Sequence, residues 1–257
     1  MNRIDKMFER KAERILSIYC TAGYPKIEST VEVLLALESS GADMIELGMP
    51  YSDPLADGPI IQHSNSIALQ NGMKMPLLFD QIQQFRSIAD GKKIPIILMG
   101  YLNPVLQYGF EKFCNDASKA GVDGLILPDL PLFEFQRDYS KIINGLGISY
   151  TFLVTPETSM ERVIQLDAAS TGFLYAVSAS STTGKSSGFN TSWISQLKKY
   201  PLKNPVLAGF GIHDRQTFNT ACQSSRGAII GSAYIKALEN NPNVKEATKN
   251  FLSSILS

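Results

Sequence analysis

The sequence has few of the residues that build disulfide frameworks or metal centres. Among its 257 residues there are only three cysteines and two histidines. Cys20, Cys114 and Cys222 lie far apart and form no CxxC pair, and His63 and His213 are widely separated. This spacing argues against a disulfide scaffold and against a zinc site, and it suits a reducing compartment. We therefore interpret the cysteines as apolar packing residues, and we expect no metal and a cytoplasmic location.

Net charge and long apolar runs are lacking as well. Lys+Arg and Asp+Glu each total 24, so the formal net charge is zero. Nothing in this balance indicates a nucleic acid or an anionic membrane as a partner. The segment 1–14 is charged throughout and lacks the apolar core of a signal peptide. No apolar stretch reaches the length of a membrane span.

Short apolar runs rich in β-branched residues recur along the chain. They are nearly continuous, as expected of parallel strands that are covered on both faces. The chain, which is 44% hydrophobic, is long enough for one large core. The expected strands are 15–23, 42–50, 94–102, 122–130, 148–156, 172–180, 204–212 and 227–235.

Segments with helical spacing alternate with these runs. In the first of them Ser29 and Glu32 are spaced as a capping box. The expected helices are 29–37, 76–90, 110–120, 133–145, 159–169, 192–200, 214–223 and 244–256. At this length, the alternation predicts a single (β/α)8 barrel domain over 1–257, with an additional N-terminal helix. No GxGxxG follows the first strand, which disfavours an open doubly wound sheet.

Two stretches interrupt the regular alternation and are expected to be extended loops. One is ELGMPYSDPLADGP (46–59) with the segment 60–72 after it, and the other is 178–190. They follow the second and the sixth expected strands. Both should therefore lie at the C-terminal face, where barrels carry their active sites.

Strand parity predicts an inward direction for Glu46. Met44, Glu46 and Gly48 share one face of their strand, and Ile45 and Leu47 suit the helix layer on the other. A carboxylate inside the barrel near its mouth is partly desolvated, so its pKa should rise and it can serve as acid and base. The alternative is an outward, solvated glutamate.

Asp53 and Asp57 stand in turn sequences, where an aspartate commonly forms a structural Asx turn. For Asp57, the pairing with Glu46 across a proline-stiffened turn favours a role in the site.

Glycines end the last two expected strands, in 209–211 and at Gly231 followed by Ser232. Barrels often bind phosphate at this position with loop amides and a helix N-terminus. Thr183 and Gly184 could add a donor. No basic residue stands beside these glycines in the sequence, and Lys185 lies in a serine-rich stretch, so we expect binding to rest on backbone dipoles. The alternative is that the glycines serve tight turns only.

The motif IELGMPYSDPLADG (45–58) resembles, position by position, the signature of the tryptophan synthase α subunit family. The resemblance covers essentially the whole chain. It continues in TAGYP (21–25), MGYLNP (99–104), PDLP (128–131), GFGI (209–212) and GSAYIK (231–236).

The resemblance implies a (β/α)8 barrel that cleaves indole-3-glycerol phosphate to indole and glyceraldehyde 3-phosphate. It implies that Glu46 and Asp57 are catalytic and that Thr183 is a lid residue that meets the aspartate on closure. The lid departs from the family pattern at Ala179 and Ser181. The implied binding residues are Gly184, Phe210, Gly211, Gly231 and Ser232 for the phosphate, and Tyr19, Tyr101 and Tyr175 for the indole ring.

The family also implies a partner, a pyridoxal-phosphate β subunit in an α2β2 heterotetramer, while this chain itself needs no cofactor. The implied contact residues are Asp53, Pro54, Asn103 and Asp129. Three alternatives remain: a different phosphate-binding barrel such as a sugar-phosphate isomerase, a free-standing indole-forming lyase, and a mainly regulatory barrel subunit.

The chemistry of the implied reaction agrees with these residues. Carbon–carbon cleavage needs an electron sink, and no lysine near a strand end would serve as a Schiff base. Protonation of indole C3 makes the ring itself the sink. Our hypothesis is that Glu46 protonates C3 and takes the hydroxyl proton, while Asp57 stabilises the positive charge at N1.

Overall fold

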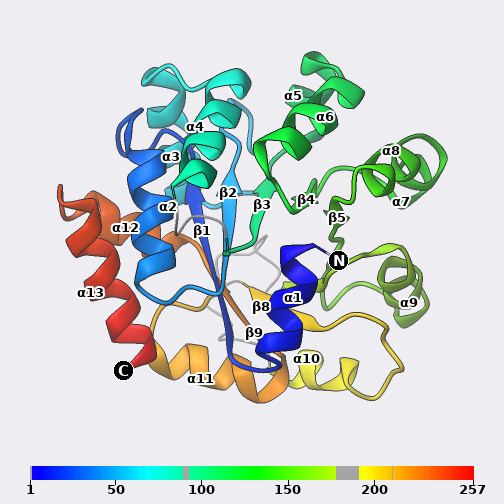
Figure 1. Cartoon of the computed structure of the whole chain (residues 1–257). Helices are drawn as coiled ribbons and strands as arrows, with labels where there is room; N and C mark the ends of the chain where they lie inside the picture. Colours follow the sequence, from blue (N-terminus) through cyan, green and yellow to red (C-terminus); the bar gives the residue numbers. More distant parts are fainter. Residues whose placement is uncertain (1, 89–92, 178–190, 210) are drawn as a thin grey trace.

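The computed structural model, shown in Figure 1, describes residues 2–88, 93–177, 191–209 and 211–257. All its neighbouring strands pair in parallel. The strands are β1 (Ile15–Thr21), β2 (Met44–Gly48), β3 (Ile96–Met99), β4 (Gly124–Ile126), β5 (Ser149–Tyr150), β6 (Leu153–Val154), β7 (Leu174–Val177), β8 (Val206–Gly209) and β9 (Gly227–Ile230).

The sheet closes on itself through one stretch of chain. The strand order is β5-β4-β3-β2-β1-β9-β8-β7-β6, so the two outermost strands are neighbours in sequence. The amide of Thr151 donates to Leu125 O at 3.1 Å, and the amide of Tyr175 donates to Phe152 O at 3.1 Å. These bonds extend the β4–β5 pairing and the β6–β7 pairing into the residues between β5 and β6. Residues 149–154 therefore act as one strand, and the predicted eight-stranded α/β barrel is confirmed.

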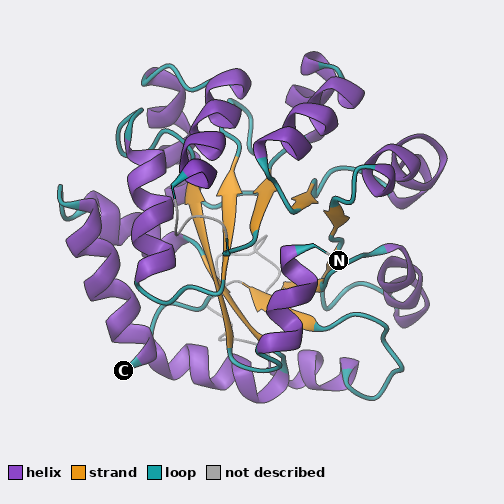
Figure 2. Cartoon of the chain, in the orientation of Figure 1, coloured by secondary structure: helices purple, strands orange, loops and turns teal. Residues whose placement is uncertain are grey.

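Helices form an outer layer around the strands (Figure 2). None of the helices within the described ranges combines the length and the apolar character that crossing a membrane needs. The helices are α1 (Arg3–Arg10), α2 (Ser29–Ser39), α3 (Pro59–Gln70), α4 (Met75–Ser87), α5 (Leu102–Tyr108), α6 (Phe110–Ala120), α7 (Leu132–Glu134), the π-helix η1 (Phe135–Tyr139), α8 (Ser140–Gly145), α9 (Met160–Ala169), α10 (Thr191–Leu197), α11 (Arg215–Ser224), α12 (Ser232–Glu239) and α13 (Val244–Leu256).

Three local predictions were wrong. The capping box at Ser29 does not form, because Ser29 is the first residue of α2 and its amide donates to Lys26 O at 3.0 Å. The segment 60–72, expected in a loop, is mostly the helix α3, whose buried residues include Ser64 and Asn65 rather than an apolar stripe. The run 227–235 is not one strand, since β9 ends at Ile230 and α12 begins at Ser232.

A compact apolar cluster fills the barrel and includes the N-terminal helix. Its members come from strands on all sides of the ring and from α1, whose Ile4 is fully buried and whose Met7 is 2% exposed. The expected N-terminal helix is thus confirmed as a plug that closes one end of the barrel. The buried members of this cluster are Ile4, Met7, Ile15, Met44, Ile97, Ile126, Phe173, Tyr175, Val177, Leu207 and Ile229.

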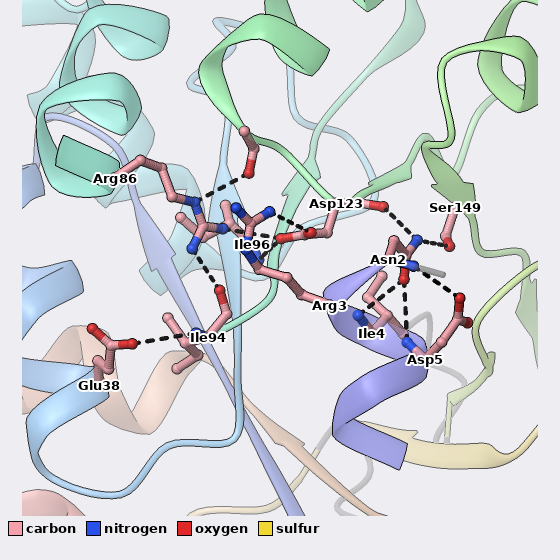
Figure 3. Close-up of polar contacts among 11 residues, drawn as sticks. Asn2, Arg3, Ile4, Asp5, Glu38, Arg86, Ile94, Ile96, Asp123 and Ser149 are labelled. Carbon is pink, nitrogen blue, oxygen red and sulfur yellow. Dashed lines mark hydrogen bonds and ion pairs between the residues drawn. The ribbon is translucent and has the colours of Figure 1, made fainter. Parts of the chain in front are cut away.

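Charged groups fasten this plug to the barrel wall (Figure 3). Asp123, only 3% exposed, accepts from Arg3 Nη1 at 2.9 Å and from Arg86 Nη2 at 2.9 Å. The same carboxylate accepts the backbone amide of Ile96 at 2.9 Å. Asn2 caps α1 and donates through Nδ2 to Ser149 Oγ at 2.6 Å. Burial lowers the pKa of Arg86 to about 10, and Asp123 opposes that lowering.

Candidate active site

A cavity of about 740 Å³ opens at the C-terminal ends of the strands. Its size falls within the usual range for small-molecule sites, and most of its walls are apolar side chains. Strand ends, the loop after β2, and residues of α3, α12 and α13 all contribute. The lining residues are Tyr19, Glu46, Asp57, Gly58, Pro59, Ile60, Ile61, Met99, Tyr175, Gly211, Ile212, His213, Ile229, Gly231, Ser232, Ala233, Lys236 and Phe251.

Glu46 reaches this cavity from inside the barrel. It lies opposite Tyr19 in the β1–β2 register and is fully buried, which confirms the inward direction expected from strand parity. Ser17 Oγ donates to Glu46 Oε1 at 3.0 Å, while Oε2 has no hydrogen-bond partner among the described residues. Burial raises the pKa of Glu46 to about 8, and the Ser17 bond limits that rise.

Asp57 approaches the cavity from the loop after β2. Tyr101 donates its hydroxyl proton to Asp57 Oδ2 at 3.3 Å, and the same hydroxyl accepts the amide of Ala56 at 3.0 Å. Gln62 of α3 donates to the backbone carbonyl of Asp57 at 2.8 Å. Burial raises the pKa of Asp57 to about 6, and the Tyr101 bond opposes the rise. The loop is therefore fastened on both sides, and Glu46 and Asp57 line one cavity.

Two tyrosines and two glycines shape the floor of the cavity. A Cβ on Gly48 would overlap the Tyr19 hydroxyl, and a Cβ on Gly209 would overlap the Tyr175 hydroxyl. Tyr19 is paired with Glu46, and Gly48 lies two residues further along β2. In the same way Tyr175 is paired with Leu207, and Gly209 lies two residues further along β8. Burial raises the pKa of both tyrosines, so their phenols stay neutral. Sequence reasoning missed this function of the two glycines, which only the strand register reveals.

Tyr101 has a different place from Tyr19 and Tyr175. All three were expected around an aromatic ring, yet among the described residues only Tyr19 and Tyr175 line the cavity. Tyr101 lies behind the loop and holds Asp57. Its position makes it a support of the carboxylate.

The part of the cavity rim that is formed by the loop after β8 and the start of α12 suits an anion. Gly211, with φ of +75°, and Gly231 and Ser232 at the start of α12 all line it. The first amides of a helix lack intrahelical partners and attract negative charge. Lys236 also lines the cavity, whereas no basic residue was expected beside these glycines. Sequence reasoning missed it because 227–235 was interpreted as strand; in a helix, Lys236 follows Ser232 on the same face.

Several predicted positions lie outside the described residues. These are Gly184 and Phe210 of the phosphate site, Thr183 of the lid, and the departures at Ala179 and Ser181.

The residues predicted for a partner surface follow β2, β3 and β4. Asp53, Asn103 and Asp129 are exposed, whereas Pro54 is buried within its own chain. In the loop after β2, Leu55 is a large apolar side chain that is 91% exposed.

Local bonds shape these loops. Asn103 Nδ2 donates to the Tyr51 hydroxyl at 3.1 Å, and Asp129 accepts the amide of Leu102 at 2.9 Å. Phe133, after β4, is 65% exposed.

The two acids differ in the form that they take at neutral pH. With a pKa of about 8, Glu46 is mainly protonated there, and with a pKa of about 6, Asp57 is mainly ionised. Two carboxyl groups whose surroundings separate their pKa values are suited to an acid and a charge-stabilising function in one reaction. The cavity therefore combines a protonated carboxyl group, an anionic carboxylate, an apolar floor and a rim suited to an anion.

Comparison with known proteins matches the chain to one family along nearly its whole length. The family model described as "Tryptophan synthase alpha chain" matches residues 6–255. The tryptophan synthase alpha chain of Flavobacterium psychrophilum is 49% identical over 244 residues, covering 94% of this chain and 95% of the relative. That of Parabacteroides distasonis is 45% identical over 258 residues, covering 99% of both chains.

Solved structures agree with the sequence relatives. The tryptophan synthase subunit alpha of Legionella pneumophila superposes with a TM-score of 0.89 at 35% identity, covering 99% of this chain and 97% of that one. A chain of Mycobacterium tuberculosis tryptophan synthase, in an aminoacrylate-bound form, gives 0.86 at 30% identity, covering 99% and 100%.

Proposed function

The chain belongs to the tryptophan synthase alpha chain family, whose reaction is the cleavage of indole-3-glycerol phosphate, and we propose that Glu46 and Asp57 perform this cleavage. The observation that carries the proposal is that the two carboxyl groups line one cavity with different pKa values.

The substrate's two ends match the two ends of the cavity. Its phosphate binds at the α12 N-terminus, with Gly211, Ser232 and Lys236. Its indole ring lies against the apolar floor between Tyr19 and Tyr175. This orientation sets the ring C3 and the adjacent hydroxyl at Glu46 and the ring N–H at Asp57.

The reaction needs one proton donor that becomes a base. Protonated Glu46 gives its proton to indole C3, and the positive charge that develops at N1 is stabilised by the Asp57 carboxylate. Glu46, now ionised, removes the proton of the substrate hydroxyl next to C3. The C3–carbon bond breaks, its electron pair returns to the ring, and a carbonyl forms. Indole and glyceraldehyde 3-phosphate leave, and Glu46 is again protonated.

The pKa values predict a bell-shaped pH dependence of kcat/KM. Activity should rise with pH as Asp57 ionises near pH 6, and it should fall as Glu46 loses its proton near pH 8. Initial rates measured between pH 5 and pH 9.5, in buffers of constant ionic strength, test this. A profile that is flat from pH 5 to pH 9 would contradict the assigned protonation states.

Asp57→Asn should keep the shape of the loop and lose its charge. Tyr101 can still donate to the amide oxygen, but stabilisation of the ring cation is lost, so we expect kcat to fall about 100-fold. The acidic limb of the pH profile should disappear in this variant. Steady-state kinetics check both results, with Tyr101→Phe as a comparison that removes the supporting bond and keeps the carboxylate. A D57N enzyme with normal kcat would exclude the charge-stabilising function.

The direct test of the function is indole release from indole-3-glycerol phosphate, measured with and without a β subunit. Release by the chain alone excludes a purely regulatory function. Absence of indole under both conditions would overturn the proposed function.

We further propose that the loop after β2 and the segment after β4, with the short helix α7, contact a pyridoxal-phosphate β subunit in an α2β2 assembly. Leu55 and Phe133 support this, since both are apolar and exposed at the end of the barrel that carries the cavity. Pyridoxal phosphate would belong to that partner, and this chain would need no cofactor. Three free cysteines support a cytoplasmic location.

A further inference from the structure

Ser17 is a polar residue in an apolar part of the barrel interior. It is fully buried on β1, where its neighbours in the strand register are Met44 of β2 and Ile229 of β9. Both neighbours belong to the apolar cluster that fills the barrel. Burying a hydroxyl among apolar groups is unfavourable unless it is hydrogen-bonded. The partner of this hydroxyl is Glu46 Oε1, at 3.0 Å.

The strand register explains how Ser17 reaches the acid. Ser17 is paired with Met44, and Glu46 lies two residues further along β2, on the same inward face. This is the diagonal relation that also brings Tyr19 against Gly48. Ser17 therefore approaches Glu46 from the closed end of the barrel. Its hydroxyl donates a hydrogen bond to Oε1, and Oε2 has no hydrogen-bond partner among the described residues.

We propose that Ser17 is a positioning residue for Glu46, which holds Oε1 so that Oε2 is the oxygen that carries the proton to and from the substrate. The inference rests on the proposed function. An oxygen that accepts a hydroxyl proton is a poor site for the carboxyl's own proton, so the proton of neutral Glu46 lies on Oε2. After transfer to C3, the carboxylate keeps the Ser17 bond, and Oε2 is free to take the substrate's hydroxyl proton.

The other titratable groups near Glu46 do not duplicate this bond. Burial raises the pKa of the neighbouring phenols and of the Cys20 thiol, so these groups stay neutral over the working pH range. Among the described residues, the titratable and charged groups that line the cavity with Glu46 are Tyr19, Asp57, Tyr175, His213 and Lys236, and the Cys20 thiol interacts with Glu46 electrostatically.

Ser17→Ala removes the hydroxyl and keeps a small side chain. A hydrogen bond to a carboxylate favours its charged form, so losing the bond should move the alkaline limb of the kcat/KM profile upward by about one pH unit. We expect kcat to fall about tenfold, because Oε1 and Oε2 become equivalent, and KM to stay within about twofold. Ser17→Thr retains the hydroxyl and should restore most of the kcat and the wild-type limb.

Ser149→Ala is the matched control. Ser149 is also a buried strand serine, but its hydroxyl accepts from Asn2 at the closed end of the barrel. This variant should lose stability without moving the pH profile. NMR titration of isotope-labelled glutamate carboxyl groups, with Glu46→Gln to assign the resonance, measures the same upward movement directly. A Ser17→Ala enzyme with wild-type kcat and an unmoved alkaline limb would overturn the inference.

The outcomes separate this inference from the proposed function. If the wild-type chain releases no indole, the proposed function fails, while the NMR titration still reports whether Ser17 acts on Glu46. If the wild type is active and Glu46→Gln is inactive, but Ser17→Ala behaves as wild type, only the positioning function of Ser17 is refuted.

Discussion

Glu46→Gln is expected to lower turnover by about 10²–10⁴-fold while substrate binding stays within several-fold. The amide cannot give a proton to C3 or take one from the hydroxyl, whereas the apolar floor and the proposed phosphate site are unchanged. Single-turnover indole release and equilibrium binding of the substrate measure the two effects separately. Glu161→Gln, an exposed substitution on α9, is the matched control and should be fully active. Near-normal turnover in E46Q would exclude Glu46 as the acid.

The same substitution is expected to stabilise the fold. Glu46 has its pKa raised from 4.5 to about 8 by burial, so between these pH values the folded chain binds more protons than the unfolded chain. Its contribution to stability therefore falls as pH rises through this window. A glutamine does not titrate, and at pH 7 the gain is of the order of 3 kcal/mol. Urea denaturation at pH 5 and pH 8 should show a gain that is larger at the higher pH.

Asp123→Ala is expected to have the largest effect on stability, about 3–5 kcal/mol of lost unfolding free energy. It removes the carboxylate that pairs with the Arg86 guanidinium, whose side chain is 9% exposed, and with Arg3 of the N-terminal helix. Urea or thermal denaturation measures the loss. Because this network lies at the closed end of the barrel, substrate KM in the remaining folded protein should change little.

Asp138→Ala provides the comparison for a surface ion pair. Asp138 pairs with Arg137 at 2.6 Å, but both side chains are well exposed and solvent screens their attraction, so the expected loss is much smaller than that of Asp123→Ala. Equal losses in the two variants would show that burial of the Asp123 network contributes nothing.

The inward direction of Glu46 was predictable from local sequence, because alternation along 44–48 is enough to direct its side chain into the barrel. The local sequence around Asp57 indicated a structural turn, and its proposed place in the site came from the pairing with Glu46 and from the family resemblance. Ser17 and Lys236 were not predictable in the same way. The contact of Ser17 with Glu46 depends on the β1–β2 register, and the place of Lys236 depends on α12 beginning at Ser232. The local sequence gives no strong signal for the register between two strands, or for the point at which an apolar run changes from strand to helix.

The helices also differ in how well the local sequence predicts them. Helices with an apolar stripe, such as α6 and α13, were predicted with the bounds that the structure shows. The helix α3 was missed because the face that it buries carries the polar residues Ser64 and Asn65. Ser64 is hydrogen-bonded to Thr21 of β1 at 2.7 Å.

The closure of the sheet through residues 149–154 makes strand pairing unequal around the barrel. A closed ladder has no free edge, so a strand can separate only where its pairing is shortest. The two short strands at the closure, β5 and β6, are each paired through two residue positions with their neighbours, whereas β2 is paired through five with β1 and four with β3. Transient opening of the barrel should thus begin at the closure. Glu46 lies on β2, next to β1, which is the strand farthest from the closure in the sheet order, so we expect such opening to reach Glu46 late.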